Sequence, residues 1–302
     1  MEYKTSVNLA GVELKNPVMT ASGTFGSAGE YGEFYDLGEL GAVVTKGVAN
    51  VPWPGNPTPR IAETRSGMLN AIGLQNPGLD VFLERDLPKL KKYDTKIIVN
   101  VCGHAPEEYL AVVERLADEP IDMMEINISC PNVNAGFLAF GQDAKHVEEL
   151  TAQIKKIAKQ PIIMKLTPNV TDITEIAKAA ETGGADALSL INTLTGMKID
   201  INRRTFAVAN KTGGVSGPVV HPIAVRMVYQ TAQAVNIPII GMGGIATPED
   251  AIEMILAGAS AVSVGTANFY NPNATIEIID GIEAYMKKNG FESVKDMVGI
   301  VK

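Results

Sequence analysis

Apolar residues follow two spacings along this chain. Eight short runs are apolar at almost every position, and the segments between them repeat an apolar residue every three or four positions. Continuous apolar runs are typical of strands buried on both faces of a parallel sheet, and the longer spacing is typical of amphipathic helices. We expect strands within residues 17–22, 42–46, 96–101, 123–128, 161–166, 187–192, 238–243 and 261–266. The clearest helices are expected at 106–117, 143–159, 172–182, 222–235, 248–257 and 275–288.

The alternation of strands with helices predicts an α/β fold, the (β/α)8 TIM barrel. Residues 8–15 predict a small N-terminal hairpin that closes the bottom of the barrel. Two connections, 47–95 and 193–236, are too long for plain loops, and such insertions are usually functional. Both follow the carboxyl end of a strand, so we expect them over the active-site face. The pattern contains no linker and predicts one domain over residues 1–302.

The charge and the N-terminal sequence exclude several classes of function. The chain has 26 lysines and arginines against 34 aspartates and glutamates, a net charge of −8. Nucleic-acid binding is not expected, because affinity for phosphates needs clustered positive charge. The first residues contain no apolar leader, and no run of about 18 apolar residues occurs. We therefore expect no secretion signal and no membrane span or anchor.

Cysteine and histidine are scarce. The two cysteines, Cys102 and Cys130, argue against disulfide bonds and for a reducing, cytoplasmic location. Two thiolates are too few for an iron–sulfur cluster, which normally takes four. The three histidines are far apart in the sequence, so no metal site is expected.

Polar side chains stand at the ends of several expected strands. They are Ser22, Lys46, Asn100, Asn127, Lys165 and Asn192. A single asparagine could simply cap the next helix, and a lysine could be a solvated loop end. Chemistry in a (β/α)8 barrel takes place at the carboxyl ends of the strands. Lysines and asparagines at five separate strand ends therefore favour a binding site.

Glycines follow the last two strands. Gly243 and Gly244 follow the seventh strand, and Gly265 with Thr266 follows the eighth. Backbone amides at these two ends form the usual phosphate site of this fold, and glycine lets the backbone approach the phosphate closely. The pair of loops predicts a phosphorylated ligand or cofactor, whose body would face Lys165.

The segment 127–133 has the sequence Asn-Ile-Ser-Cys-Pro-Asn-Val. Its Cys130 follows a buried strand and has polar neighbours, so its thiol is a candidate nucleophile or general base. No histidine adjoins it, so a Cys–His dyad is not indicated. Cys102 is interpreted as a small buried apolar residue.

These motifs together indicate a family. The sequence resembles the class 1 dihydroorotate dehydrogenases over essentially its whole length, and most closely their class 1B catalytic subunit. The motifs that carry the resemblance are residues 16–23, 45–47, 70–78, 127–133, 165–169, 192–193 and 213–217, with the paired glycine loops. One departure is Phe137, where a small residue or glycine is expected in the loop after the cysteine.

The resemblance implies one FMN per chain and the oxidation of dihydroorotate to orotate in pyrimidine biosynthesis. Cys130 would be the general base that removes the C5 proton, a role that serine takes in the membrane-linked class 2 enzymes, and a hydride would leave C6 for the flavin. Residues 132–141 would form a lid that keeps water out. Lys165 would stabilise negative charge on the reduced flavin.

The resemblance also implies which residues bind the two ligands. For FMN they are Ser22, Lys46, Gly47, Asn100, Asn127, Lys165, Ile191, Gly217, Gly243, Gly244, Gly265 and Thr266. For the substrate they are Lys46, Asn70, Ala71, Ile72, Gly73, Leu74, Asn127, Asn132, Asn192 and Thr193. Side-chain amides suit a pyrimidine, because each one offers a donor and an acceptor.

Class 1B also implies partners. A catalytic homodimer would carry an electron-transfer subunit on each side, forming a heterotetramer in which that subunit holds FAD and a 2Fe–2S cluster and passes electrons to NAD+. The class 1A enzyme, a homodimer that reduces fumarate, shares the core motifs and is the alternative. A non-redox barrel that binds a phosphorylated metabolite, such as a lyase or an isomerase, is a more distant alternative. A tRNA-reducing flavin barrel is disfavoured by the charge of −8.

Overall fold

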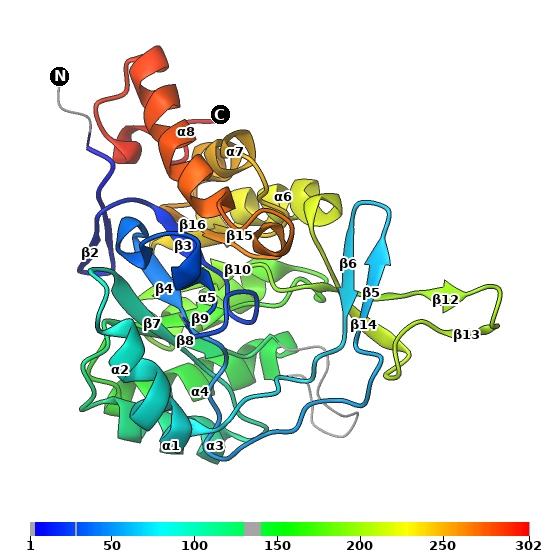
Figure 1. Ribbon diagram of the computed structural model, residues 1–302. Coiled ribbons are helices and arrows are strands. Elements are labelled where there is room, and N and C mark those ends of the chain that lie inside the picture. The colour runs from blue at the N-terminus through cyan, green and yellow to red at the C-terminus, as the bar shows by residue number, and fades with distance from the viewer. Residues whose placement is uncertain (1–3, 28, 130–139, 302) are drawn as a thin grey trace.

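The computed structural model describes residues 4–27, 29–129 and 140–301. At its centre is a closed barrel in which each strand pairs in parallel with the next (Figure 1). In barrel order the strands are β3 (Val18–Thr20), β4 (Ala42–Val44), β7 (Lys96–Val101), β8 (Met123–Asn127), β9 (Ile162–Lys165), β10 (Ala187–Leu190), β15 (Ile239–Met242) and β16 (Ala261–Val264). Each expected apolar run contains one of these strands, so the predicted (β/α)8 barrel is confirmed.

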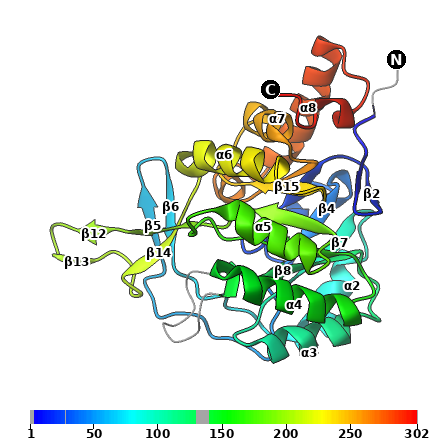
Figure 2. The ribbon, with the colours of Figure 1, turned by 180° about the vertical axis from the view of Figure 1, so that it is seen from behind.

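Helices surround the barrel (Figures 1 and 2). The long ones are α3 (Pro106–Leu116), α4 (Ala144–Ile157), α5 (Ile173–Thr182), α6 (His221–Ala232), α7 (Pro248–Ala257) and α8 (Ala274–Asn289). Side chains and glycines near their ends determine where these helices begin and stop. The side chain of Thr247 accepts a hydrogen bond from the backbone N–H of Asp250, and the Asp250 side chain accepts one from Thr247, which closes a capping box at α7. Gly258, with φ +126°, ends the same helix.

One large apolar core lies inside the barrel and between the barrel and its helices. Every residue of β8, β9, β10, β15 and β16 is buried. Strands packed on both faces in this way are rigid, so side chains at their carboxyl ends have defined positions.

The predicted N-terminal hairpin is present as β1 (Val7–Leu9) and β2 (Val12–Leu14), which pair antiparallel. Ala10 and Gly11 form its turn, both with positive φ. Leu9 and Leu14 are completely buried in the main core. The hairpin therefore packs into the same core as the barrel.

The two long connections meet in a separate four-stranded antiparallel sheet. β5 (Ile61–Thr64) and β6 (Gly67–Asn70) come from the first connection, and β11 (Leu194–Met197) and β14 (Thr212–Ser216) come from the second. Strand β14 pairs with β6, which places Gly214 opposite Asn70. Segments far apart in the sequence therefore share one sheet beside the barrel (Figure 1).

Several shorter elements were not predicted from the sequence. Residues 79–90 form α1 (Leu79–Val81), a π-helical turn (Phe82–Asp86) and α2 (Leu87–Leu90). The helical character of this segment is hard to recognise from the sequence because it contains Pro88, and proline usually ends a helix. The strands β12 (Ile199–Asp200) and β13 (Thr205–Phe206) form an arm that projects from the body (Figures 1 and 2). Short 3-10 helices occupy Tyr31–Glu33, Leu37–Glu39, Phe140–Gln142, Pro218–Val220, Thr266–Phe269 and Val294–Met297.

Candidate active site

A cavity opens at the carboxyl ends of the barrel strands and extends beneath the four-stranded sheet. It encloses about 1200 Å³ of atom-free space, including its open mouth. Most of the described residues singled out from the sequence line it, namely Ser22, Lys46, Asn70, Ile72, Gly73, Leu74, Asn127, Lys165, Ile191, Asn192, Thr193, Gly217, Gly243, Gly244, Gly265 and Thr266. The fold thus brings strand ends from all around the barrel to one cavity.

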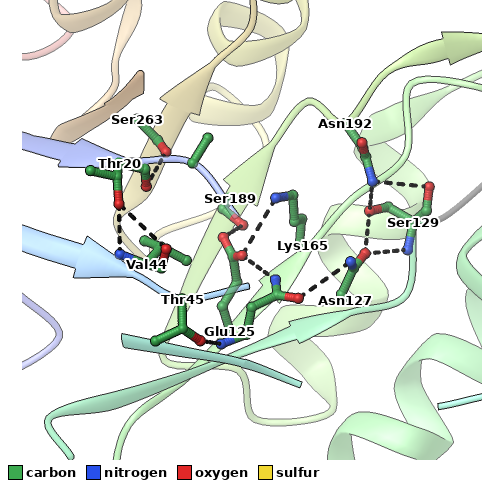
Figure 3. Close-up of polar contacts among 12 residues, drawn as sticks. Thr20, Val44, Thr45, Glu125, Asn127, Ser129, Lys165, Ser189, Asn192 and Ser263 are labelled. Carbon is green, nitrogen blue, oxygen red and sulfur yellow. Dashed lines mark hydrogen bonds and ion pairs between the residues drawn. The ribbon is translucent and has the colours of Figure 1, made fainter. Parts of the chain in front are cut away.

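Lys165 is the positive charge at the barrel side of this cavity, at the end of β9. Its Nζ lies 3.5 Å from Oε2 of Glu125, and the two side chains are 5% and 1% exposed. Figure 3 shows Lys165, Glu125 and Ser189 facing one another. Burial of a lone ammonium would be costly, so the nearby carboxylate stabilises the charge that lines the cavity.

Glu125 is a residue that the sequence analysis missed. Its carboxylate accepts hydrogen bonds from Nδ2 of Asn100 at 2.5 Å and from Oγ of Ser189 at 2.8 Å, in addition to its contact with Lys165. These partners come from three other strands, β7, β9 and β10. A detectable signal existed, because Glu125 is the one charged residue in the apolar run 123–128.

A second set of polar contacts leads from the buried Asn100 to the cavity-lining Asn192. Nδ2 of Asn127 donates to Oδ1 of Asn100 at 3.4 Å, and Oγ of Ser129 donates to Oδ1 of Asn127 at 2.8 Å. Nδ2 of Asn192 donates to Oγ of Ser129 at 2.7 Å. Figure 3 shows Asn127, Ser129 and Asn192 arranged in this order. Two cavity-lining amides, Asn127 and Asn192, are therefore held in place.

A glycine cradle, defined here as Gly217, Gly243, Gly244 and Gly265, forms another part of the wall. Gly217, Gly243 and Gly244 have φ of +96°, +127° and +72°, which side chains rarely allow. A Cβ at Gly244 would lie 2.8 Å from the backbone N of His221, the first residue of α6. The missing side chain at Gly244 thus leaves space beside the N-terminus of α6. The N-terminus of a helix attracts anions, because its backbone N–H groups and its dipole present positive charge.

Two side chains support the cradle. His221 is buried, and its Nδ1 lies 3.0 Å from the carbonyl oxygen of Gly243 while its Nε2 lies 3.1 Å from Oε2 of Glu253. Oγ1 of Thr266 donates to Oγ of Ser216 at 2.8 Å, and both residues line the cavity. These contacts hold the loops after β14, β15 and β16 together around the glycine cradle.

Lys46 contributes a further positive charge to the cavity. A Cβ placed on Gly23 would lie 3.6 Å from its Nζ, so the ammonium passes close to the loop after β3. With Lys165, this gives the cavity two lysines. Two cations in a partly enclosed space favour an anionic ligand.

The segment 70–74 follows β6 and lines the cavity through four of its five predicted residues. Nδ2 of Asn70 lies 3.4 Å from the carbonyl oxygen of Gly214, across the β6–β14 pair. Ala71 is the exception: it is buried with Leu69 and Val208, and its backbone N–H donates to the carbonyl oxygen of Arg60. Its N–H is therefore already used within the protein.

Two other predicted residues lie behind the cavity wall. Asn100 is fully buried and bonded to Glu125 and Asn127. A Cβ on Gly47 would lie 3.0 Å from Oδ1 of Asn100, which places the two residues side by side. Both belong to the layer that supports the cavity. Cys130, Asn132 and Phe137, with the lid expected around them, lie outside the described residues.

The structure adds lining residues that the sequence analysis had not assigned to either ligand. They are Ala21, Gly23, Thr24, Ile61, Met68, Val215, Ser216, Val220, Met242, Ser263 and Phe269. Most are apolar or small, and such residues give no local signal of a site. Beside Phe269, burial raises the pKa of Tyr270, and the charge of Asp250 raises it further.

Nowhere within residues 4–27, 29–129 and 140–301 do three or more metal-ligating side chains gather. No helix in these same ranges combines the length and the apolar character that crossing a membrane requires.

Comparison with known proteins decides the family. A family model described as dihydroorotate dehydrogenase matches residues 4–286. The chain is 68% identical over 298 residues to a protein of Lachnoclostridium phytofermentans named dihydroorotate dehydrogenase B (NAD(+)), catalytic subunit, with 99% of each chain covered. The chain belongs to the dihydroorotate dehydrogenase family. The resemblance inferred from the motifs is thus confirmed, and the chain is an oxidoreductase of this family.

Further relatives agree with this family assignment. A protein with the same name in Alkaliphilus metalliredigens is 64% identical over 293 residues, 97% of each chain. A dihydroorotate dehydrogenase from Eimeria tenella, solved in complex with ferulenol, superposes with a TM-score of 0.82 at 25% identity and covers 99% of this chain and 91% of its own. The barrel and its insertions are therefore those of a dihydroorotate dehydrogenase.

Dihydroorotate dehydrogenases depend on a flavin, and the cavity fits such a group. The glycine cradle offers backbone amides and a helix N-terminus to a phosphate. Lys165 stands at the barrel side of the same cavity, where it can face the body of the cofactor. The amides of Asn127 and Asn192 also line this cavity and carry no charge, which suits a neutral ring with donors and acceptors.

Proposed function

We propose that this chain is the catalytic subunit of a class 1B dihydroorotate dehydrogenase, which oxidises dihydroorotate to orotate in pyrimidine biosynthesis and passes the electrons to NAD+ through a partner subunit. The observation that carries the proposal is one cavity that combines a glycine cradle, two lysines and a set of fixed amides. The names of the relatives at 68% and 64% identity support the NAD+-linked form.

In this proposal the cofactor is FMN. The cradle and Thr266 would hold its phosphate, and Ser22, Ile191 and Lys165 would lie along its body. When bound, FMN supplies a two-electron acceptor for the hydride that leaves C6 of the substrate. Lys165, whose side chain is only 5% exposed, would place its ammonium group beside the cofactor, and fixed charges act strongly at such buried positions.

The substrate would bind between the cofactor and the segment 70–74. Asn70, Asn127, Asn192 and Thr193 would offer donors and acceptors to the pyrimidine ring, with Asn132 added from the neighbouring loop. Lys46 would face the substrate carboxylate as well as the cofactor.

Cys130 would take the proton from C5. Its position in the sequence, after the buried β8 and Ser129, puts it next to the substrate amides along the chain. A thiol with a pKa of about 8.5 has enough thiolate near neutral pH to act as a base when it is held close to a weak acid. The loop 132–141 would close over the substrate and keep water away.

The assembly proposed for the chain is a homodimer with an FAD- and 2Fe–2S-carrying subunit on each side. The two cysteines of this chain are too few for such a cluster, so the cluster must be carried elsewhere. The proposed location is the cytoplasm, and neither a nucleic acid nor a membrane is a proposed partner.

The visible absorbance of the purified chain, before and after anaerobic dihydroorotate, tests this function. A flavin band that bleaches is the expected result. A band that does not bleach would exclude dihydroorotate, and no band even after added FMN would contradict the flavoprotein assignment. Adding NAD+ with and without the partner subunit, or fumarate, then separates the class 1B enzyme from class 1A.

A further inference from the structure

Four side-chain hydrogen bonds beside the cavity form one series, and all four run in the same direction. Asn192 donates to Ser129, Ser129 to Asn127, Asn127 to Asn100, and Asn100 to Glu125. This series is called the amide relay below. It begins at a cavity-lining amide and ends at a carboxylate within the barrel (Figure 3).

The direction is fixed by chemistry at the Glu125 end. An ionised carboxylate only accepts hydrogen bonds, so the amide of Asn100 must turn its NH2 group toward Glu125. The carbonyl oxygen of that amide then faces Asn127, which must also present NH2. Because each amide has one donating and one accepting end, the first orientation determines the second.

Independent backbone contacts support the same orientation farther along. The backbone N–H of Ser129 donates to Oδ1 of Asn127 at 3.3 Å, and that of Thr193 donates to Oδ1 of Asn192 at 2.8 Å. These contacts place the carbonyl oxygens where the relay requires them. The relay is therefore consistent from both ends.

Glu125 also holds the cation of the site. Oε2 accepts from Asn100 at 2.5 Å and lies 3.5 Å from Nζ of Lys165, while Oε1 accepts from Ser189 at 2.8 Å. One carboxylate thus contacts the cofactor-side lysine and the first amide of the relay. Such buried networks are strongly directional, because any unpaired member is costly in a low-dielectric interior.

We propose that Glu125 is the positioning residue of the site, which orients Lys165 toward the cofactor and, through the amide relay, fixes which atoms Asn127 and Asn192 present to the pyrimidine. Glu125 does not line the cavity, so it acts through these residues. This inference rests on the proposed function, because it names the ligands that the oriented groups receive.

Glu125→Gln is the first test, since glutamine keeps the size and removes the charge. A glutamine amide has a donor as well as an acceptor, so the polarity of the relay is no longer imposed. Ser189 tolerates the change, because its hydroxyl can accept as well as donate. Because the side-chain amides then lose their single orientation, we expect weaker binding of both FMN and orotate. The variant should still fold.

The readouts are the dissociation constant of FMN, from the fluorescence of the free flavin, and that of orotate, from the absorbance of the holoenzyme. For Glu125→Gln both constants are expected to rise about tenfold, the effect of one mismatched buried hydrogen bond. The KM for dihydroorotate is expected to rise with them. The melting temperature of each variant reports stability separately.

Asp122→Asn is the matched control. Asp122 precedes the same strand, and its carboxylate accepts from the backbone N–H of Ile97 at 2.8 Å and pairs with Lys96 at 3.1 Å. The change is again carboxylate to carboxamide beside a lysine, but this lysine, Lys96, does not line the cavity, whereas Lys165 does. Equal losses of ligand affinity in Asp122→Asn and Glu125→Gln would overturn the proposal in favour of general damage to β8.

Ser129→Ala cuts the relay in the middle. This change is expected to raise the dissociation constant of orotate about tenfold. The dissociation constant of FMN should stay within about twofold of the wild-type value, because Lys165 and Asn100 remain held by Glu125. Unchanged orotate affinity in Ser129→Ala, or both affinities within twofold of wild type in Glu125→Gln, would overturn the proposal. Failure of the proposed function would be seen differently, as a wild-type holoenzyme that neither binds orotate nor is bleached by dihydroorotate.

Discussion

The ammonium of Lys165 lies 3.5 Å from the carboxylate of Glu125, and both side chains are almost completely buried. The pair joins β9 to β8 at the point where the barrel meets the cavity. An isolated buried charge is strongly disfavoured, so the attraction between the two groups offsets part of the free-energy cost of burying each one. The lysine that we propose to face the cofactor is therefore also part of the stability of the barrel.

Lys165→Met should lower the free energy of unfolding. Removing one partner of a buried pair typically costs about 3–5 kcal/mol, because the other charge is left unpaired. The double variant Lys165→Met/Glu125→Gln should lose less than the sum of the two single variants. Urea unfolding without added flavin measures both quantities.

The control for this prediction is Lys155→Met. Lys155 pairs with Asp186 at 2.5 Å, but the two side chains are 40% and 28% exposed. An ion pair accessible to water should be worth no more than about 1 kcal/mol. A similar loss for the two lysines would contradict the role assigned to burial.

Cys130→Ala should keep the flavin band and lose turnover by about 100-fold or more, the usual contribution of a positioned general base. Stopped-flow bleaching of the flavin by dihydroorotate measures the affected step. Cys102→Ala is the control, since Cys102 is fully buried and packs with Ala49 and Trp53. Full activity in Cys130→Ala at neutral pH would remove the base assignment.

Gly244→Ala should weaken FMN binding. Gly244 has φ +72°, and a Cβ there would meet the carbonyl oxygen of Gly217 and the backbone of His221 at 2.8 Å. The loop must shift away from the proposed phosphate position, which should raise the dissociation constant of FMN about tenfold or more. Fluorescence titration of the apoprotein with FMN measures it.

Gly290→Ala is the control for Gly244→Ala, because it adds backbone strain without pushing a neighbouring segment aside. Gly290 has a similar φ of +76°, but a Cβ there would meet open space. It should cost about 1 kcal/mol of stability from the left-handed backbone and leave FMN affinity unchanged. Equal FMN affinity in the two variants would argue against the phosphate position at the cradle.

Tyr35 should make the protein sensitive to strong base. Burial raises the pKa of Tyr35 from 10.0 to about 12, while its hydrogen bond with Thr275 partly opposes the shift. The neutral phenol is favoured in the fold, so its contribution to stability is complete below pH 10 and is lost as the pH rises toward 12. Tyr35→Phe should flatten the fall in unfolding free energy over this interval, whereas Tyr229→Phe, at an exposed position, should not.

The barrel could be predicted from the sequence because its strands are buried on both faces. A strand such as Ile162–Lys165 is apolar up to the cavity-lining lysine at its end, so the local sequence shows both the strand and the end of it that carries polar residues. The helices were predicted for a similar reason. Thr247, Pro248 and Gly258 carry the start and stop signals of α7 within the sequence itself.

The four-stranded sheet beside the barrel could not be predicted in this way. Its pairing of Gly214 with Asn70 joins residues from two separate connections, and no local periodicity contains that information. The helical segment Leu79–Leu90 was also missed, because it is short and contains Pro88. Both features depend on contacts between distant parts of the chain.

The amino-acid sequence alone shows which residue types stand at the strand ends, and hence the lysines, amides and glycines of the candidate site. Those positions follow from strand periodicity and from motifs whose spacing is visible in the chain. Folding of the whole chain is needed to bring Glu125 into contact with Lys165, Ser189 and Asn100, and to place Asn100 beside Gly47. The reason is physical: hydrogen bonds between barrel strands depend on the register and closure of the whole barrel, which no single segment specifies.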